Sequence, residues 1–458
     1  MSRARRALGL VVIGLSLATA ACAGGTGSEV KGTGDQAPVD DDAAERAAGP
    51  LLDLAVELEQ QLADARPGAD LAVAPLPVAV TLAQARSGAA GATAEELERV
   101  LHTPVAGGAE QQAAGLSSLD RIVLSRSGEQ RDPSGRTGKV SIDLAQSLWL
   151  QKGTPIDAPW LDTMAATWGT GVRATDFRSD PETARKAVNS WAADATNDHI
   201  DQLAPRGSIS PTTRILAAGA AYLKAPWVTA FADTETRLGP FRHLDGSVTA
   251  TSMMRNPELD DVRYGAGDGW VAVDLPYLGR SLWMTVIVPD EGRFTAVEQG
   301  LDGDGLRSVL DHLRPTTIDL RLPKFGFTTD TPLTDALRSL GLTQATDPLA
   351  ADFGGISTEP LSITSVLHQT YLAVAEQGTE ATASAPKPPA TTTTTRLRPS
   401  TSTTGTDPTV PGEPPGTAPT TTQRATTVVV VDRPFLVLVR DRPTGAALFY
   451  GRVLSPNG

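Results

Sequence analysis

Apolar residues recur at helical spacing over Leu51–Leu62, and a Pro-Gly pair ends the pattern. Intervals of three and four residues place apolar side chains on one face of a helix, so this stretch predicts a first helix. A second helix is predicted up to Arg86, after a short apolar stretch that contains Pro75 and Pro77. Thr93, with Glu96 three residues on, is typical of the capping box that begins a third.

Later segments alternate between helical and strand-like patterns. Helices are predicted near Ala158–Trp168, Pro181–Ala195 and Leu333–Leu340. Strand-like apolar runs cover Val140–Gln151, Arg214–Trp227, Trp270–Leu278, Leu282–Asp290 and Thr317–Phe327. Because the two kinds of element are mixed without regular βαβ alternation, the chain is expected to be an α+β protein with large sheets rather than a doubly wound fold.

One low-complexity segment interrupts the fold near its end. In residues 386–427, Thr and Pro supply 25 of 42 residues, and the large apolar residues are Leu397 and Val410. Such a segment cannot bury a core. The most strand-like sequence of the chain, Val428–Leu454, follows it. The segment is therefore interpreted as a loop inserted within the fold.

The N-terminus has the features of an export signal. Three arginines precede an apolar run over Ala7–Ala18, which is too short to span a bilayer. Small residues then lead to Cys22, as in the bacterial lipoprotein cleavage box, although Thr19 stands where Leu is commoner. The sequence predicts a lipoprotein-type signal peptide at 1–22, a flexible tether at 23–47 and one domain at 48–458. An ordinary cleaved signal peptide is the alternative.

Charge and cysteine content narrow the possible functions. The formal net charge of −13 argues against a nucleic-acid partner, because phosphate binding requires clustered cations. Cys22 is the single cysteine, so lipidation there would leave the folded part without thiol chemistry or disulfides. Contact with a membrane is then expected through a lipid anchor alone.

Familiar catalytic patterns are missing from the sequence. It contains no G-x-S-x-G, no H-E-x-x-H and no Gly-rich phosphate loop with Lys-Ser/Thr. The histidines are scattered without metal-ligand spacing (His102, His199, His243, His312, His368). The sequence therefore predicts a protein that is not an enzyme and that needs neither a metal nor a cofactor.

Several separated blocks together resemble the serpin family of protease inhibitors, which act by inserting their own loop into a sheet. The blocks are NSWAADATNDHIDQLAP from Asn189, AAYLKAPW ending at Trp227, LPKFGF from Leu322, AEQGTEATAS from Ala375 and DRPFLVLVRDRPTGAALFYGRVLSP from Asp432. Their order and spacing match the family over about Leu51 to Pro456, apart from the Pro/Thr insertion. The resemblance implies a serpin-like fold with helices around large mixed sheets and an exposed reactive loop.

The resemblance implies that a hinge follows Ala375. Its residues are Gly378, Thr379, Glu380, Ala381, Thr382, Ala383 and Ser384. In an inhibitory serpin this segment leaves solvent and becomes a central strand, so small side chains are needed for it to pack between existing strands. Gly378 permits the required change of backbone direction. A plain alanine-rich linker is the alternative interpretation.

The resemblance also places residues where the loop enters the sheet. Trp227, Lys324 and Glu376 would lie there, with Lys324 and Glu376 as an ion pair. His368 resembles the family's central sheet histidine, whose ring is usually held by polar neighbours. Ala74, Pro77 and Gly219 stand where the family usually carries two serines and an asparagine. His368 is therefore expected to lack its usual partners.

The prolines after Ala385 argue against full insertion. Pro386, Pro388 and Pro389 lack the amide that each residue of a central strand donates. Candidate reactive bonds are Thr392-Thr393, at about the family's usual distance, and Arg396-Leu397, four residues later. An arginine would suit a trypsin-like protease, and a threonine an elastase-like or subtilisin-like one.

Two functions therefore remain open. The first is an extracellular or cell-envelope serine protease inhibitor, a monomer held by a lipid or secreted, that traps its target when the loop is cut. The second keeps the serpin-like fold without inhibition, and uses the Pro/Thr loop of 386–427 as a spacer or a binding element.

Overall fold

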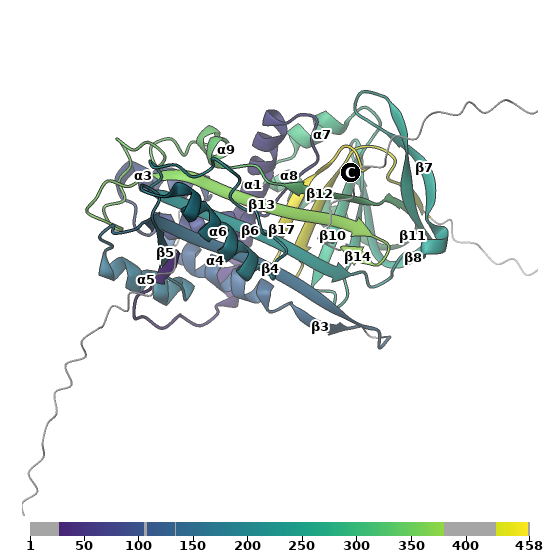
Figure 1. Ribbon diagram of the computed structural model, residues 1–458. Helices are drawn as coiled ribbons and strands as arrows, with labels where there is room; N and C mark the ends of the chain where they lie inside the picture. Colours follow the sequence, from purple (N-terminus) through teal and green to yellow (C-terminus); the bar gives the residue numbers. More distant parts are fainter. Residues whose placement is uncertain (1–26, 105–107, 133, 380–426, 457–458) are drawn as a thin grey trace, which may run out of the picture.

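The computed structural model describes residues 27–104, 108–132, 134–379 and 427–456. Helices pack around two large sheets in this part of the chain (Figure 1). The helices are α1 (Asp41–Ala65), α2 (Pro75–Arg86), α3 (Gly91–Val100), α4 (Gly108–Leu124), α5 (Ala158–Trp168), α6 (Pro181–Ala195), α7 (Phe294–Gly300), α8 (Gly303–His312) and α9 (Thr334–Ser339), with a 3-10 turn, η1, at Asp233–Glu235.

The first sheet carries the hinge. Its strand order is β1-β5-β4-β6-β14-β13-β12, and β3 pairs with β4. The strands are β1 (Ser28–Val30), β3 (Gly128–Arg131), β4 (Thr137–Gln151), β5 (Val172–Thr175), β6 (Ile215–Pro226), β12 (Phe325–Thr329), β13 (Ile363–Ala375) and β14 (Gly378–Thr379). Parallel and antiparallel pairs occur together, since β6 is antiparallel to β4 and parallel to β13.

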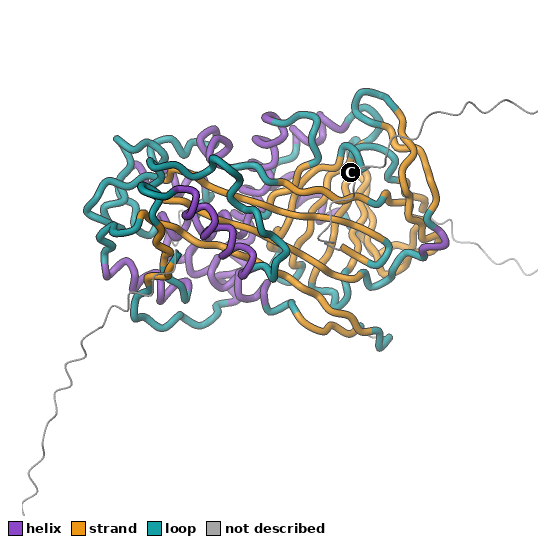
Figure 2. The backbone as a smooth tube through the Cα atoms, viewed as in Figure 1, coloured by secondary structure: helices purple, strands orange, loops and turns teal. Residues whose placement is uncertain are grey.

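The second sheet has the order β15-β11-β8-β9-β10-β16-β17-β2, with β7 on β8. Its strands are β2 (Leu71–Val73), β7 (Arg237–Arg242), β8 (Val248–Gly267), β9 (Trp270–Pro276), β10 (Leu282–Pro289), β11 (Arg314–Pro323), β15 (Thr427–Val430), β16 (Phe435–Asp441) and β17 (Ala446–Val453). Figure 2 shows the two groups of strands lying against each other, with most helices toward one end. The α+β fold with large mixed sheets agrees with the sequence prediction.

Two hydrophobic cores position the elements. The larger core includes α1, α2 and the inward faces of both sheets. The smaller one lies under α6, where Ala184, Val188 and Ala192 pack against Leu216, Ala218 and other residues of the first sheet. Helix α6 therefore covers one face of that sheet, as Figure 1 shows. The end of the molecule that contains β14 lies opposite the end that contains β5 and α5.

The N-terminal segment differs from the predicted tether. Residues 28–30 pair with β5, the Thr33 amide donates to Asp162 Oδ1 at 2.8 Å, and the Ala37 amide donates to the Ala166 carbonyl at 2.8 Å. This stretch is poor in large apolar groups, but its backbone hydrogen bonds attach it to β5 and α5. The expectation of a flexible tether is therefore wrong for residues 28–47.

Helix α1 begins ten residues before its predicted start, at Asp41 instead of Leu51. The side chain of Asp40 caps it by accepting from the Ala43 amide at 2.9 Å. The added turns are rich in small residues that the apolar pattern does not detect. They are nevertheless buried, because Gly115 of α4 approaches the Ala43 carbonyl so closely that a Cβ would lie 2.4 Å from its oxygen.

The predicted capping box at Thr93 is also wrong. Helix α3 begins at Gly91, and its N-cap residue Ala90 makes no side-chain cap. Thr93 lies inside the helix and accepts a hydrogen bond from the Asp352 amide at 2.9 Å, while Glu96 accepts from the Gln344 amide at 2.7 Å. Both side chains therefore bind a distant loop instead of their own helix end.

Candidate functional site

The hinge begins as a short strand inside the first sheet. Strand β14 lies between β6 and β13: Gly378 pairs with Pro226 and Ala375, and Thr379 pairs with Ala225 and Val374. The chain thus leaves β13, turns back through two residues and starts a new antiparallel strand. The first residues of the predicted hinge are therefore already paired on both sides.

Gly378 is required at its position by a close backbone contact. Its φ is +153°, and a Cβ there would lie 2.1 Å from the Ala225 carbonyl oxygen and 2.7 Å from the Pro226 Cα. Neither neighbouring atom can rotate away, because both belong to the backbone of β6. The sequence indicated a flexible glycine, and the structure adds that no side chain fits.

Replacing Gly378 with alanine is expected to lower the free energy of unfolding by roughly 2 to 4 kcal/mol, since the methyl group forces β14 away from β6. Urea unfolding measures the change. Gly300→Ala is the matched control, because a Cβ at Gly300 meets no atom within 4 Å. Equal stability of the two variants would show that the contact with β6 is unimportant.

Trp227 fixes the turn between β13 and β14. Its amide donates to the Gln377 carbonyl at 2.9 Å, and its Nε1 donates to the Ala375 carbonyl at 3.1 Å. The indole stacks on Tyr277, with ring centroids 4.4 Å apart. The buried Tyr277 and Thr379 hydroxyls are hydrogen-bonded to each other. Sequence reasoning missed Tyr277, because a tyrosine in a strand-like run carries no distinguishing signal.

Lys324 and Glu376 form the expected ion pair, with Nζ 2.9 Å from Oε2. The Thr236 hydroxyl donates to the other carboxylate oxygen at 2.9 Å. Burial acts to raise the pKa of Glu376, but the hydrogen bonds from Lys324 and Thr236 outweigh it and leave the pKa below its ordinary value. Lys324 is 42% exposed, so the pair orients the turn more than it stabilises the fold.

These residues form one group, the hinge cluster, which consists of Trp227, Tyr277, Lys324, Glu376, Gly378 and Thr379. Beyond the hinge cluster, no gap is open between β6 and β13 into which β14 could extend. Strand β13 pairs directly with β6, from Ile363 opposite Ile215 to Tyr371 opposite Tyr222. Any further growth of β14 therefore has to separate β6 from β13.

His368 lies in this β6–β13 contact and is 2% exposed. The family's usual side-chain partners are absent, as the sequence indicated, but the backbone supplies others. Its Nε2 accepts from the Ala74 amide at 3.0 Å, and its Nδ1 lies 3.2 Å from the Gly219 carbonyl oxygen, to which a protonated Nδ1 donates. Ala74 and Gly219 lack the family's usual side chains, and both bind the ring through main-chain atoms. A Cβ at Gly219 would lie 3.2 Å from Pro77 Cβ, so Pro77 occupies the space next to it.

Burial lowers the pKa of His368 to about 4, although the hydrogen bond to Gly219 acts in the opposite direction. As the pH falls, the His368 ring of the unfolded chain takes up a proton near pH 6.5, whereas the ring in the folded protein does so only at lower pH. The neutral ring therefore makes its full contribution to the free energy of unfolding above pH 6.5. As the pH falls toward 4, the free energy of unfolding decreases by roughly 3 kcal/mol.

Urea unfolding between pH 7 and pH 4.5 measures this loss, and His368→Gln provides the comparison because an amide does not titrate in this range. The variant is expected to show a shallower decline of stability with falling pH than the unmodified protein. Identical slopes would contradict the role assigned to His368.

Other predicted site residues lie outside the described part of the chain. They are Cys22, the hinge residues Glu380, Ala381, Thr382, Ala383 and Ser384, and the candidate reactive bonds Thr392-Thr393 and Arg396-Leu397. Among the residues that are described, no group of three or more His, Cys, Asp or Glu could hold a metal. No described helix is long and apolar enough to cross a membrane.

Comparison with known proteins identifies the class to which this fold and hinge belong. The sequence model of the family described as Serpin (serine protease inhibitor) matches residues 51–456. An uncharacterised serpin-like protein of Thermococcus kodakarensis is 31% identical over 383 residues, which are 83% of this chain and 80% of that protein. The chain belongs to the serpin family.

Solved structures share the fold at lower sequence identity. Native tengpin, a thermophilic serpin, has a TM-score of 0.73 at 21% identity, covering 94% of this chain and all of that one. Thyroxine-binding globulin in complex with thyroxine has a TM-score of 0.71 at 20% identity, covering 90% of this chain and all of that one. The serpin fold expected from the sequence is confirmed.

Proposed function

We propose that the protein inhibits serine proteases through cleavage of its loop followed by growth of β14 between β6 and β13. The observation that carries the proposal is the start of this strand, because Gly378 and Thr379 already pair with both neighbours. The register of those pairs determines where each following residue would lie. Membership of the serpin family supports the proposal.

Continuing the register of β14 along β6 assigns a partner to every hinge residue. The expected pairs are Glu380 with Lys224, Ala381 with Leu223, Thr382 with Tyr222, Ala383 with Ala221, Ser384 with Ala220, Ala385 with Gly219, and Pro386 with Ala218. Leu223 and Ala221 belong to the core between the sheets, whereas Ala220 and Ala218 face α6. Directly opposed residues of a sheet share a face.

This register explains the composition of the hinge. Ala381, Ala383 and Ala385 would all face the core between the sheets, where little room is available. Glu380 would face the exposed Lys224, an opposite charge on the neighbouring strand. The small residues of β6 from Ala217 to Ala221 likewise leave space for an added strand. The sequence therefore suits insertion as far as Ala385.

Pro386 would end this growth. Opposite Ala218 it would lie in the middle of a sheet, where one neighbouring strand would lose the amide hydrogen bond that proline cannot donate. We therefore propose insertion of 380–385, shorter than the length of β6 would allow. A protease attached at Thr392 or Arg396 would stay nearer to the sheet than one attached farther along the Pro/Thr segment.

Incubation with trypsin, elastase and subtilisin, followed by denaturing gels, tests the proposal. An inhibitor is expected to give a covalent complex with at least one protease that withstands denaturation. Mass spectrometry of that complex would identify the reactive bond, with Thr392-Thr393 and Arg396-Leu397 as the expected positions. Cleaved protein alone with every protease would contradict inhibition.

A second function is favoured by the same prolines. If they prevent useful insertion, the fold would present the segment of 386–427 as a spacer or a binding element. Thyroxine-binding globulin, which shares the fold, was solved in complex with thyroxine, so ligand binding is compatible with this architecture. Unchanged heat stability after loop cleavage would favour this second function.

We also propose that the protein acts outside the cytoplasm, with Cys22 as a lipid attachment site. The lipoprotein-like sequence before Cys22 supports this proposal. In a bacterial host, Cys22→Ala is expected to move the protein from the membrane fraction to the soluble fraction. An unchanged distribution would contradict lipid attachment.

A further inference from the structure

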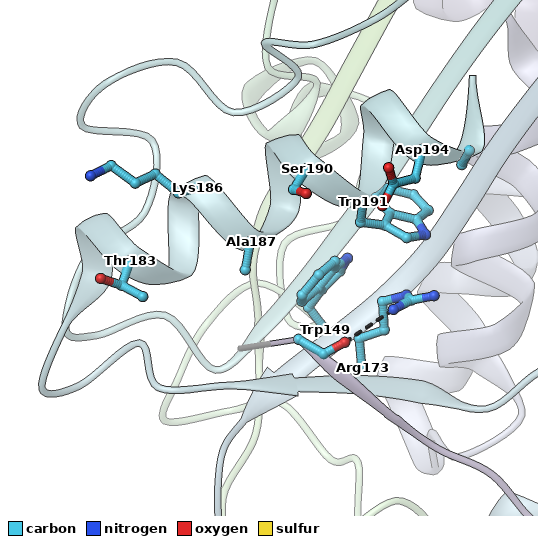
Figure 3. A pocket seen from close by; sticks show the side chains of 10 residues that line it. Trp149, Arg173, Thr183, Lys186, Ala187, Ser190, Trp191 and Asp194 are labelled. Carbon is cyan, nitrogen blue, oxygen red and sulfur yellow. Dashed lines mark hydrogen bonds between the residues drawn. The ribbon is translucent and has the colours of Figure 1, made fainter. Parts of the chain in front are cut away.

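Gly27 lies at a fixed point on the edge of the first sheet. Strand β1 pairs with β5, with Glu29 opposite Arg173, and the Arg173 guanidinium donates to the Gly27 carbonyl at 3.0 Å. Figure 3 shows this hydrogen bond next to Trp149. A Cβ at Gly27 would lie 3.0 Å from the ring of Trp149, so the backbone passes directly against the indole. The sheet therefore fixes the point from which the chain leads toward Cys22.

A pocket of about 640 Å³ opens at this point, between α6, β4 and β5. Figure 3 shows Lys186, Trp191 and Asp194 of α6 around it. Lys186 is exposed and Trp191 is half-buried. Tryptophan and lysine both suit a membrane surface, because each joins an apolar body to a polar tip. Two carboxylates, from Glu29 and Asp194, offset the cations, so this surface suits a zwitterionic bilayer as well as an anionic one.

The hinge cluster lies toward the far end of the same sheet. Strand β4 spans the two levels, since Trp149 pairs with β5 and Ser141 pairs with Lys224 of β6. Two residues beyond Lys224, β6 pairs with Gly378 of β14. Eight residues along β4 and two more along β6 place the levels about ten residues apart, or roughly 33 Å at the usual rise of a strand. Figure 1 shows β5 and β14 at opposite ends accordingly.

Cys22 precedes Gly27 by five residues. A fully extended chain spans at most about 3.4 Å per residue, so Gly27 lies within roughly 17 Å of Cys22. A lipid on Cys22 would enter the bilayer and place that residue at its surface. The reach of this tether is about half of the separation between β5 and the hinge cluster. The end that contains the hinge cluster therefore cannot turn toward the lipid.

We propose that the membrane contacts the end of the protein formed by Gly27, β5 and α6, here called the anchor end, and that the hinge cluster faces away from it. The orientation rests on the proposed lipid attachment at Cys22. Lys186 and Trp191 then lie next to the lipid headgroups. The hinge cluster stands roughly 33 Å farther out. A loop that starts after Thr379 therefore meets soluble proteases and not those embedded in the bilayer.

Energy transfer to labelled lipid tests this orientation. The lipidated full chain carries a donor dye at Lys186→Cys or at Lys139→Cys, and is bound to phosphatidylcholine vesicles that contain an acceptor dye on the headgroups. Both lysines are exposed, and Lys139 lies on β4 at the level of the hinge cluster. The dye reacts with the added cysteine alone, because the Cys22 thiol carries the lipid. Transfer from position 186 is expected to be severalfold stronger, since the two levels lie roughly 33 Å apart.

A lengthened tether provides the control. Insertion of about twenty Gly/Ser residues between Cys22 and Gly27 adds roughly 25 Å of flexible reach. The anchor end is then free to leave the lipid, while the lipid on Cys22 still holds the chain on the vesicle. Transfer from position 186 is expected to fall severalfold, and the bound fraction is expected to stay the same.

Three results would overturn the proposed orientation. Equal transfer from positions 186 and 139 in bound protein would contradict the orientation and leave lipid attachment intact. Unchanged transfer from position 186 in the lengthened chain would show that the short tether does not hold the anchor end against the lipid. A chain that fails to sediment with the vesicles would contradict lipid attachment itself, and the orientation with it.

Discussion

Cleavage of the loop between Ala385 and Thr427 is expected to raise the midpoint of thermal unfolding by roughly 5 to 10 °C. Insertion of 380–385 would extend β14 by six residues, whose backbone groups would form hydrogen bonds alternately with β6 and β13, at the cost of the direct β6–β13 pairs. A net gain on the order of 5 kcal/mol corresponds to this shift, because 1 kcal/mol moves the midpoint of a chain of this size by roughly 1 to 2 °C.

Scanning calorimetry of the intact and the cut protein measures this shift. The gain should remain smaller than an insertion over the whole length of β6 would give, because Pro386 would end the ladder. A protein cut in the same loop but carrying Ala383→Arg is the control, and it should not gain stability. Equal midpoints for the intact and the cut forms of the unmodified protein would favour the spacer function instead.

Ala383→Arg is expected to convert an inhibitor into a substrate, with the yield of covalent complex reduced at least about tenfold. In the register of β14, residue 383 opposes Ala221 and faces the core between the sheets. An arginine there would bury a guanidinium group without a partner, which costs several kcal/mol. Cleavage of the loop should proceed, whereas insertion should not.

Glu380→Gln is the control for this variant. Residue 380 would oppose the exposed Lys224, so removing its charge should change the yield of complex less than twofold. Denaturing gels quantify the complex and the cleaved protein for both variants. The register would be contradicted if Glu380→Gln and Ala383→Arg reduced the complex equally.

The sequence predicted the parts of this molecule in which pattern and local chemistry agree. Apolar runs indicated β4, β6, β9 and β10, because buried strands read as near-continuous apolar sequence. The run from Thr317 to Phe327 was harder, since it contains two strands, β11 and β12, that separate at Lys324 and belong to different sheets. A change of sheet leaves little trace in an apolar pattern.

The hinge cluster was predicted in part. Trp227, Lys324 and Glu376 were placed by their resemblance to the family, and the structure brings them together around the start of β14. Tyr277 was missed because its role depends on a stacking partner 50 residues away. The partners of His368 were missed for a different reason: they are main-chain atoms, whose positions depend on the fold and not on the identity of Ala74 or Gly219.

The N-terminal segment shows the same limit. Residues 23–47 were interpreted as a tether because they contain few large apolar groups, and composition is a fair guide to disorder. Their attachment rests on backbone pairing with β5 and on contacts between small residues and α5. A Cβ at Gly32, for example, would lie 2.4 Å from the Leu161 backbone. Such contacts depend on the absence of side chains, which composition alone cannot distinguish from disorder.

Hydrogen exchange of the intact and the loop-cut protein, resolved to single amides, tests the central claim most directly. The amides of 380–385 should become strongly protected after cleavage, and protection should end at Pro386. The amides of β13 that pair with β6 should stay protected, because they would exchange one strand partner for another. Equal exchange of 380–385 in the two forms would contradict growth of β14, and with it the proposed inhibition.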